Sequence, residues 1–261
     1  MPTQLIERMA VECDGAGEPV LMIHGLGGTS NVWTPLLPAL ARHQAIRPDL
    51  PGSGRSHRVE GPLSIGRFVE GMQRVCAALR LDRVHVAAHS LGTIVALHLA
   101  VAAPRLVRSL ALFGPLASPP DAARPGIRAR AAKARGEGEA GMQAIADTLL
   151  TTAVSAETRA RRPVAVAAVR ELLMRQCPDG YARTCEALAD AEAADARAIA
   201  CPTLLVTGDE DAVAPPQSVR QLGARIPGAR VEVLSRCGHW TPIEKPAECE
   251  DLLKRFYAQR M

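Results

Sequence analysis

Ala88-His89-Ser90-Leu91-Gly92 is the stretch that decides the fold of this 261-residue chain. It follows an apolar run at 84–87 that is typical of a strand, and it leads into a run at 91–103 that is typical of a helix. A serine between small residues at such a turn matches the nucleophile elbow, which presents the hydroxyl at the start of the helix. Ala88 stands where the motif usually has glycine and adds only a methyl group. We interpret the elbow as intact and expect a positive φ at Ser90, although five residues alone also fit an ordinary strand-to-helix turn.

Two later loops carry an acid and a histidine in the chain order that fits such a serine. The apolar run 203–207 ends in Gly208-Asp209-Glu210-Asp211, and the run 231–234 is followed by Cys237-Gly238-His239-Trp240. Each loop follows the C-terminal end of a predicted strand, where open α/β sheets collect their catalytic groups. The order serine, acid, histidine is one of the known orders of a catalytic triad.

A glycine-rich turn lies upstream of these motifs. The run 20–23 predicts a strand, and it leads into His24-Gly25-Leu26-Gly27-Gly28. Such a turn can leave a backbone N–H free to face a negatively charged oxygen. We therefore expect the backbone N–H groups of Leu26 and Leu91 to form an oxyanion hole.

Composition fits a globular enzyme and excludes several other classes. Charged residues make up 22% of the chain and hydrophobic residues 48%, and the net charge of +4 comes from scattered basic residues. This argues against a nucleic-acid surface. The seven cysteines include no C-x-x-C pair, which argues against a zinc site or disulfide framework and favours a reducing, cytoplasmic location. We see no signal peptide and no apolar run long enough to span a membrane.

Predicted strands and helices alternate over most of the chain. This rhythm predicts an α/β fold with a mostly parallel sheet that is covered by helices on both faces. Beyond the motifs above, an edge hairpin is expected within 5–13, strands at 44–47 and 107–112, and helices at 31–41, 64–79 (with Ser64 as N-cap), 217–226 and 246–260.

The rhythm breaks between residues 116 and 197, where no strand pattern is found. Helical patterns occur there around 138–150, 164–177 and 180–189. We interpret 116–197 as a helical cap inserted into a core made of 1–115 and 198–261. The cap should cover the strand ends and supply most of a substrate pocket.

These motifs together resemble the α/β-hydrolases of the esterase and lactonase type, and most closely the 3-oxoadipate enol-lactonases. The superfamily at large shares His24-Gly25, the stretch 49–56, His89-Ser90-Leu91-Gly92 and Gly238-His239, so these motifs imply mechanism rather than substrate. The lactonase resemblance lies in the cap, in Arg135-Gly136, Ile145-Ala146-Asp147, Gly180-Tyr181-Ala182 and Cys185-Glu186-Ala187-Leu188. Two features depart from it: Leu149-Leu150-Thr151-Thr152 replaces a tryptophan-phenylalanine pair, and Thr93 replaces a second glycine.

The catalytic roles can be assigned from order and position. Ser90 is the expected nucleophile and His239 the base that later returns the proton. Asp211 is the acid expected to orient His239, with Asp209, Glu210 and the more distant Asp121 as alternatives. The remaining histidines lie in turns, strands or helices without a partner motif: His24, His43, His57, His85, His89 and His98.

The substrate-binding residues are predicted from the same motifs. An enol-lactone carries a carboxylate, for which Arg135 is the expected cation, although a solvated helix arginine is the alternative. Trp240 and Val213 are further candidates. The sequence thus predicts an enzyme that needs no cofactor or metal and cleaves a small carboxylic ester or lactone through an acyl-enzyme.

Other reactions and roles stay open. They are cleavage of carbon–carbon bonds or thioesters, perhydrolysis, and non-catalytic ligand binding on the same fold. Dehalogenases and epoxide hydrolases are disfavoured because they carry Asp at the position of Ser90. No nucleic-acid or membrane partner is expected, and the oligomeric state is left open.

Overall fold

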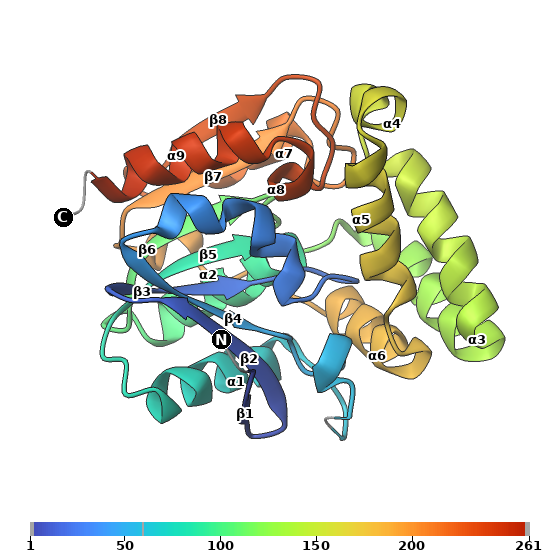
Figure 1. Cartoon of the computed structure of the whole chain (residues 1–261), viewed down its shortest axis with the longest axis horizontal. Coiled ribbons are helices and arrows are strands. Elements are labelled where there is room, and N and C mark those ends of the chain that lie inside the picture. The colour runs from blue at the N-terminus through green and yellow to red at the C-terminus, as the bar shows by residue number, and fades with distance from the viewer. Residues whose placement is uncertain (1–2, 59, 259–261) are drawn as a thin grey trace.

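The computed structural model describes residues 3–58 and 60–258, and its centre is an eight-stranded sheet (Figure 1). The strand order is β1-β2-β4-β3-β5-β6-β7-β8. β2 pairs antiparallel with β1 and with β4, and every later pair is parallel. The strands are β1 (Gln4–Ile6), β2 (Met9–Gly15), β3 (Glu18–Ile23), β4 (His43–Pro48), β5 (Val84–His89), β6 (Val107–Phe113), β7 (Thr203–Gly208) and β8 (Arg230–Leu234). The predicted mostly parallel sheet is confirmed.

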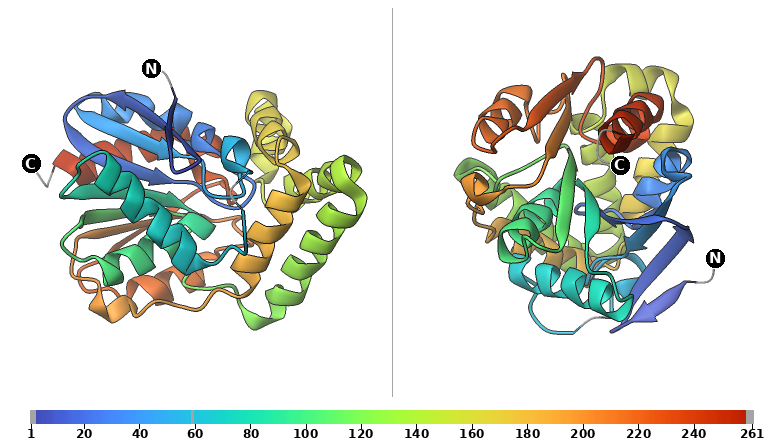
Figure 2. Two further views of the ribbon diagram at one scale, coloured as in Figure 1. Left: turned by 90° about the horizontal axis from the view of Figure 1, so that it is seen from below. Right: turned by 90° about the vertical axis from the view of Figure 1, so that its left-hand side faces the viewer.

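Helices cover both faces of this sheet (Figure 2). On one face α1 (Ile65–Ala78) packs against α2 (Leu91–Ala102), and on the other α9 (Pro246–Ala258) packs against η1 (Ser30–Leu40). α7 (Pro216–Gly223) lies against β7 and β8. Strands such as β5 and β7 are buried along their whole length because they are covered on both sides. Ser64 caps α1 as predicted, accepting a hydrogen bond from the Arg67 N–H.

The helix predicted at 31–41 differs from the structure in its type. η1 is a 3₁₀ helix, and it contains Pro35 and Pro38. Proline has no N–H to donate and clashes with the carbonyl four residues earlier, so an α-helix is disfavoured here. The apolar spacing was still informative, because Val32, Trp33 and Leu36 are fully buried.

Four α-helices occur in the chain between β6 and β7, and they are grouped at one end of the sheet (Figure 1). They are α3 (Arg124–Thr152), α4 (Ala156–Arg161), α5 (Pro163–Met174) and α6 (Pro178–Ala189), and we call them the cap helices. α3 begins well before the predicted 138, because Ile127, Ala131 and Ala134 form a buried stripe of mostly small side chains. It is interrupted at Gly138, where φ is +61°. Among the residues that the structure describes, no strand falls within 116–197. None of the described helices is long and apolar enough to span a membrane.

Candidate active site

Ser90, His239 and Asp211 lie next to one another at the C-terminal ends of β5, β8 and β7. The Ser90 Oγ lies 2.8 Å from the His239 Nε2, and the His239 Nδ1 lies 2.9 Å from the Asp211 Oδ2. All three residues are buried. This chain of hydrogen bonds allows the imidazole to take a proton from the serine while the carboxylate stabilises the resulting positive charge.

The elbow geometry follows from close packing of its strand and helix. Ser90 has φ +53°, the positive value expected from the motif and rare for a residue other than glycine. A Cβ at Gly92 would lie 2.4 Å from the Ile23 carbonyl oxygen, and one at Gly25 would lie 2.6 Å from the Ser90 Cβ. Neither position therefore has room for a side chain.

Asp211 is fixed by its own loop. Its Oδ1 accepts hydrogen bonds from the N–H groups of Val213 and Ala214, both at 2.8 Å, and its Oδ2 accepts one from the Thr207 hydroxyl. Burial alone would raise the pKa of Asp211, but the charge of His239, its hydrogen bond and the two backbone donors lower the pKa below its ordinary value. The carboxylate is therefore ionised when His239 needs it.

The other acids considered from sequence have different partners. Asp209 accepts from the Cys237 N–H, and Glu210 accepts from the Ala156 N–H. Asp121 is almost fully exposed and pairs with Arg124. Asp211 is the one of the four whose carboxylate contacts His239.

His89 supports His239 although it is not the base. Its Nε2 lies 2.9 Å from the His239 carbonyl oxygen, so it must donate there. Complete burial, with the neighbouring His239, lowers the pKa of His89 to about 3. The ring is therefore neutral, and it also lies against Trp240, with ring centroids 5.3 Å apart.

The expected oxyanion hole lies between two loops. Leu26 lines the same cavity as Ser90, and Leu91 opens α2. Neither N–H forms a hydrogen bond within residues 3–58 and 60–258. The Leu26 turn is braced by His24, whose Nδ1 donates to the Gly25 carbonyl and whose Nε2 accepts from the Leu50 N–H. Burial lowers the pKa of His24, which keeps this ring neutral.

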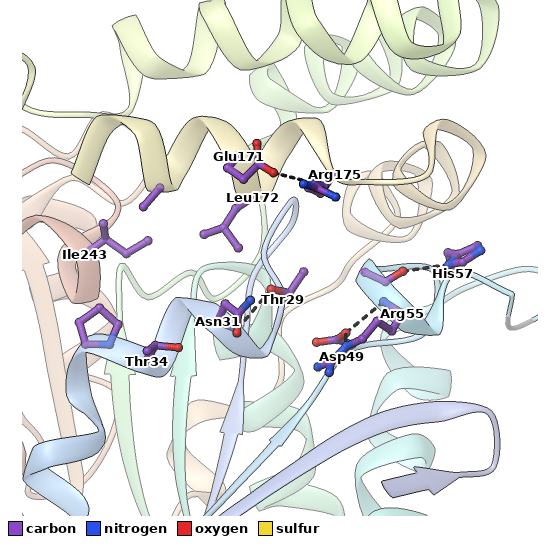
Figure 3. Close-up of a pocket in the computed structure, with 13 residues that line it drawn as sticks. Thr29, Asn31, Thr34, Asp49, Arg55, His57, Glu171, Leu172, Arg175 and Ile243 are labelled. Carbon is purple, nitrogen blue, oxygen red and sulfur yellow. Dashed lines mark hydrogen bonds and ion pairs between the residues drawn. The ribbon is translucent and has the colours of Figure 1, made fainter. Parts of the chain in front are cut away.

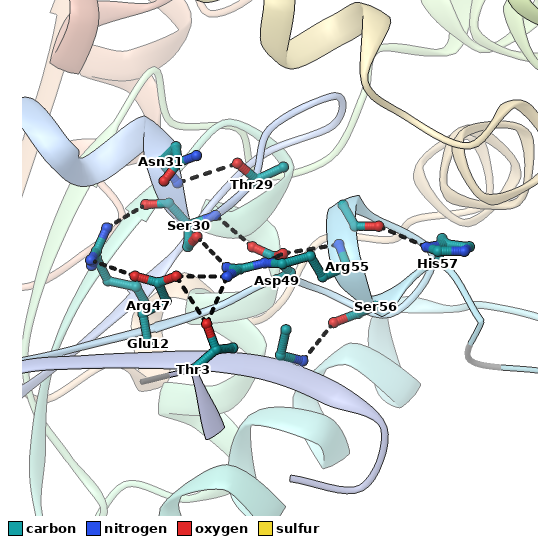
Figure 4. Close-up of polar contacts among 12 residues, drawn as sticks. Thr3, Glu12, Thr29, Ser30, Asn31, Arg47, Asp49, Arg55, Ser56 and His57 are labelled. Carbon is teal, nitrogen blue, oxygen red and sulfur yellow. Dashed lines mark hydrogen bonds and ion pairs between the residues drawn. The ribbon is translucent and has the colours of Figure 1, made fainter. Parts of the chain in front are cut away.

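A buried carboxylate fixes the far side of this turn (Figure 4). The Asp49 Oδ1 accepts from the Ser30 N–H, and its Oδ2 accepts from the backbone and side chain of Arg55. Burial opposes ionisation of Asp49, but the Arg55 hydrogen bonds, the nearby His24 and the Ser30 N–H together outweigh it, so the pKa of Asp49 is lowered. This explains why the stretch 49–56 is part of the catalytic framework although it contributes no reacting group.

The catalytic cavity holds about 410 Å³ and is lined mainly by apolar side chains. Ser90, His239, Leu26, Trp240 and Val213 all contribute to it. Trp240 and Val213, the other two residues predicted to bind substrate, thus line the same cavity as Ser90 and His239. Cap residues complete the wall, among them Ile127, Arg130, Thr148, Leu149, Thr152 and Leu188.

Arg135, the cation predicted from sequence, is not among the residues that line this cavity. Its guanidinium is exposed and forms ion pairs with Glu186 at 2.7 Å and Asp179 at 3.4 Å, which join α3 to α6. The hydrogen bond to Glu186 raises the pKa of Arg135. A cation that two carboxylates already neutralise is a poor partner for a substrate anion.

Arg130 takes the position that Arg135 was expected to hold. It lines the catalytic cavity and, with His239, is one of two ionisable side chains in that lining. Within the described parts of the chain no acidic side chain pairs with Arg130. Five residues of α-helix turn by about 140° beyond a full turn, so Arg130 and Arg135 lie on opposite edges of the buried stripe of α3.

A second, larger cavity of about 900 Å³ lies between α5 and η1 (Figure 3). It is lined by residues such as Thr29, Leu172 and Ile243 and by no member of the triad. The arginines on its wall are already paired with acids, Arg175 with Glu171 and Arg55 with Asp49. We therefore place the chemistry in the smaller cavity.

One group of side chains has the composition of a metal site. Glu18, His43 and His85 bring possible ligand atoms within 4.8 Å of one another. They lie at the N-terminal ends of β3, β4 and β5, the opposite edge of the sheet from Ser90. No spacing pattern in the sequence predicts this group, because parallel strands bring together residues that are far apart in the chain. The Glu18 carboxylate is already engaged by Arg108 and His85.

Comparison with known proteins agrees with this geometry. Residues 18–246 match the family described as the alpha/beta hydrolase fold. The chain belongs to this family. RutD of Azorhizobium caulinodans, a protein named for carbamate hydrolysis, is 46% identical over 102 residues, which cover 39% of this chain and only 38% of RutD.

Two of the similar proteins that match nearly the whole chain are an enzyme and a solved structure. The 2-hydroxymuconate semialdehyde hydrolase of Pseudomonas sp. strain CF600 is 32% identical, with 94% of this chain and 88% of that protein covered. The enol-lactonase structure from Burkholderia xenovorans LB400 superimposes with a TM-score of 0.89 at 26% identity, and covers 98% of this chain and 100% of its own. The protein is thus a hydrolase of this family, and the comparisons leave its substrate open.

Proposed function

We propose that this hydrolase cleaves a carboxylic ester or lactone, with Ser90 as nucleophile, His239 as base and Asp211 as the acid that orients the base. The observation that carries the proposal is the continuous hydrogen-bond chain from the Asp211 carboxylate through His239 to the Ser90 hydroxyl. The structural similarity to an enol-lactonase supports a lactone or ester substrate.

Each step uses a group that is already in place. The Ser90 Oγ attacks the carbonyl carbon while the His239 Nε2 takes its proton. The oxygen that becomes negative is stabilised by the N–H groups of Leu26 and Leu91. The tetrahedral intermediate then collapses, His239 protonates the leaving alkoxide, and an acyl-enzyme remains on Ser90. Water, deprotonated by His239, releases the acid and restores the serine.

The lining of the cavity suggests which esters fit. A volume of about 410 Å³ suits a small molecule, and the apolar wall suits a hydrocarbon chain or ring. Arg130 lies on that wall and pairs with no acid among the residues that the structure describes, and we assign it to a carboxylate on the substrate. No cofactor or metal is needed for these steps. The seven cysteines are unpaired, which supports a reducing, cytoplasmic location.

Carbon–carbon bond hydrolysis is the second candidate, because a relative that matches nearly the whole of this chain is named a semialdehyde hydrolase. The test is a panel of p-nitrophenyl esters and lactones, with and without a carboxylate, assayed beside a vinylogous 1,5-diketone acid. Faster turnover of esters or lactones supports the proposal. Turnover of the diketone acid alone would show that the second candidate is correct.

A further inference from the structure

Glu244 is a buried carboxylate beside the catalytic histidine that the proposed reaction does not use. It ends the short helix α8 (Thr241–Glu244), and its side chain is fully buried. Its Oε2 accepts hydrogen bonds from the N–H groups of Ser155 at 2.9 Å and Gly238 at 3.2 Å. Its Oε1 accepts one from the Trp240 N–H at 3.1 Å.

No cation pairs with this carboxylate within the described residues. Lys245, the next residue, pairs instead with Glu157, and Arg162 donates to the backbone carbonyl of Glu244 rather than to its side chain. Burying an ionised carboxylate is costly unless hydrogen bonds compensate for lost water. Here three backbone N–H groups provide that compensation.

The three donors surround His239. Gly238 and Trp240 are its immediate neighbours in the chain, and Ser155 lies in the junction between α3 and α4 of the cap. The His239 N–H itself donates to the Ala153 carbonyl at 2.9 Å, and Ala153 also lines the catalytic cavity. A Cβ at Gly238 would lie 2.7 Å from the Ser155 nitrogen, so the loop and the junction are in direct contact.

We propose that Glu244 is a positioning residue for the reaction, which holds the backbone on both sides of His239 against the cap junction. This inference rests on the proposed role of His239 as base. Gly238 is conformationally permissive, so the loop needs an external constraint to hold the imidazole between Ser90 and Asp211. A displacement of about 1 Å can cost about 100-fold in rate.

The carboxylate form of Glu244 matters for this role because both of its oxygens must accept hydrogen bonds. A glutamine in this position offers one oxygen, which can keep either the two bonds of Oε2 or the one bond of Oε1. Its amide N–H₂ would then face a backbone N–H, donor against donor. Alanine would leave all three N–H groups without this partner.

The test compares Glu244→Gln and Glu244→Ala with Glu157→Gln as a matched control. Glu157 is also a carboxylate at the cap junction, but it pairs with the side chains of Lys245 and Arg236 rather than with the backbone N–H groups on either side of His239. For Glu244→Gln we expect kcat to fall by about 10–100-fold with KM within about twofold, because a misplaced base slows chemistry more than binding. Glu244→Ala should lose more, and Glu157→Gln should stay near the wild type.

A second readout does not depend on turnover. The His239 Nδ1–H, hydrogen-bonded to Asp211, should give a downfield proton NMR signal that is identified by its loss in His239→Ala. Glu244→Gln should shift or broaden this signal, and Glu157→Gln should not. If the wild type shows the signal but cleaves no ester or lactone, the proposed function fails while the positioning role is still tested.

The inference is overturned if Glu244→Gln keeps the wild-type kcat and NMR signal. It is also overturned if this variant loses only thermal stability, with the kcat of its folded fraction unchanged. If Glu244→Ala does not fold, the glutamine variant alone decides between these outcomes.

Discussion

Replacing Asp211 with asparagine should disable the base by forcing the wrong tautomer of His239. The Asp211 Oδ1 accepts two backbone N–H groups at 2.8 Å, whereas its Oδ2 faces the His239 Nδ1 at 2.9 Å and the Thr207 hydroxyl. An asparagine will therefore keep its oxygen at the Oδ1 site and turn its N–H₂ toward His239. The His239 Nδ1 must then accept, so the proton moves to Nε2, which faces Ser90 and can no longer take its proton.

The expected loss follows from this inversion. Loss of the correct tautomer costs about 10⁴-fold in kcat, or about 5.4 kcal/mol at 1.36 kcal/mol per tenfold. KM should change little, because Asp211 does not line the catalytic cavity. The assay is steady-state hydrolysis of the best p-nitrophenyl ester or lactone, with Asp209→Asn as the control on the same loop. Retention of a tenth or more of the wild-type kcat by Asp211→Asn would refute the reasoning, as would an equal loss in Asp209→Asn.

Three further outcomes are expected. Arg130→Ala should lower kcat/KM for a carboxylate-bearing lactone by about 10–100-fold, because a charge-assisted contact contributes about 1.5–3 kcal/mol, and it should leave kcat/KM for a neutral ester unchanged. Arg135→Ala should change neither value. The reverse pattern would contradict the assignment. His89 takes up a proton near its ordinary pKa of 6.5 in the unfolded chain but only near pH 3 in the folded protein, so the free energy of unfolding should fall as the pH drops from about 6.5 toward 3. Urea titrations should show a shallower fall for His89→Asn. An identical dependence of the free energy of unfolding on pH in this variant would contradict the role given to His89. Activity should persist in excess EDTA, and loss that zinc restores would show a metal requirement.

The sequence was most informative where function imposes a local motif. The elbow around Ser90 requires a strand, a sharp turn and a helix within a few residues, and the structure contains all three in order. The loops with Asp211 and His239 could be placed because parallel strands bring their C-terminal ends to one edge. The proline-containing helix at 31–41 was located correctly, and only its 3₁₀ geometry differed.

The cap was harder to predict because its determinants are not local. Arg130 and Arg135 belong to the same basic helix, and which of them faces the cavity depends on where α6 packs, through Glu186 and Asp179. Glu244 gave no sequence signal either, because its three partners are backbone N–H groups that any residue can offer. Such features emerge only when distant segments are brought into contact.

The most direct test of the central claim is covalent labelling of Ser90. A fluorophosphonate should add to the wild-type protein at one site, which mass spectrometry of the digested protein should locate at Ser90. A slow ester substrate, quenched early, should leave its acyl group on the same residue. Ser90→Ala should abolish both adducts and lower turnover by about 10⁴–10⁶-fold. Labelling that persists unchanged in Ser90→Ala would contradict the account.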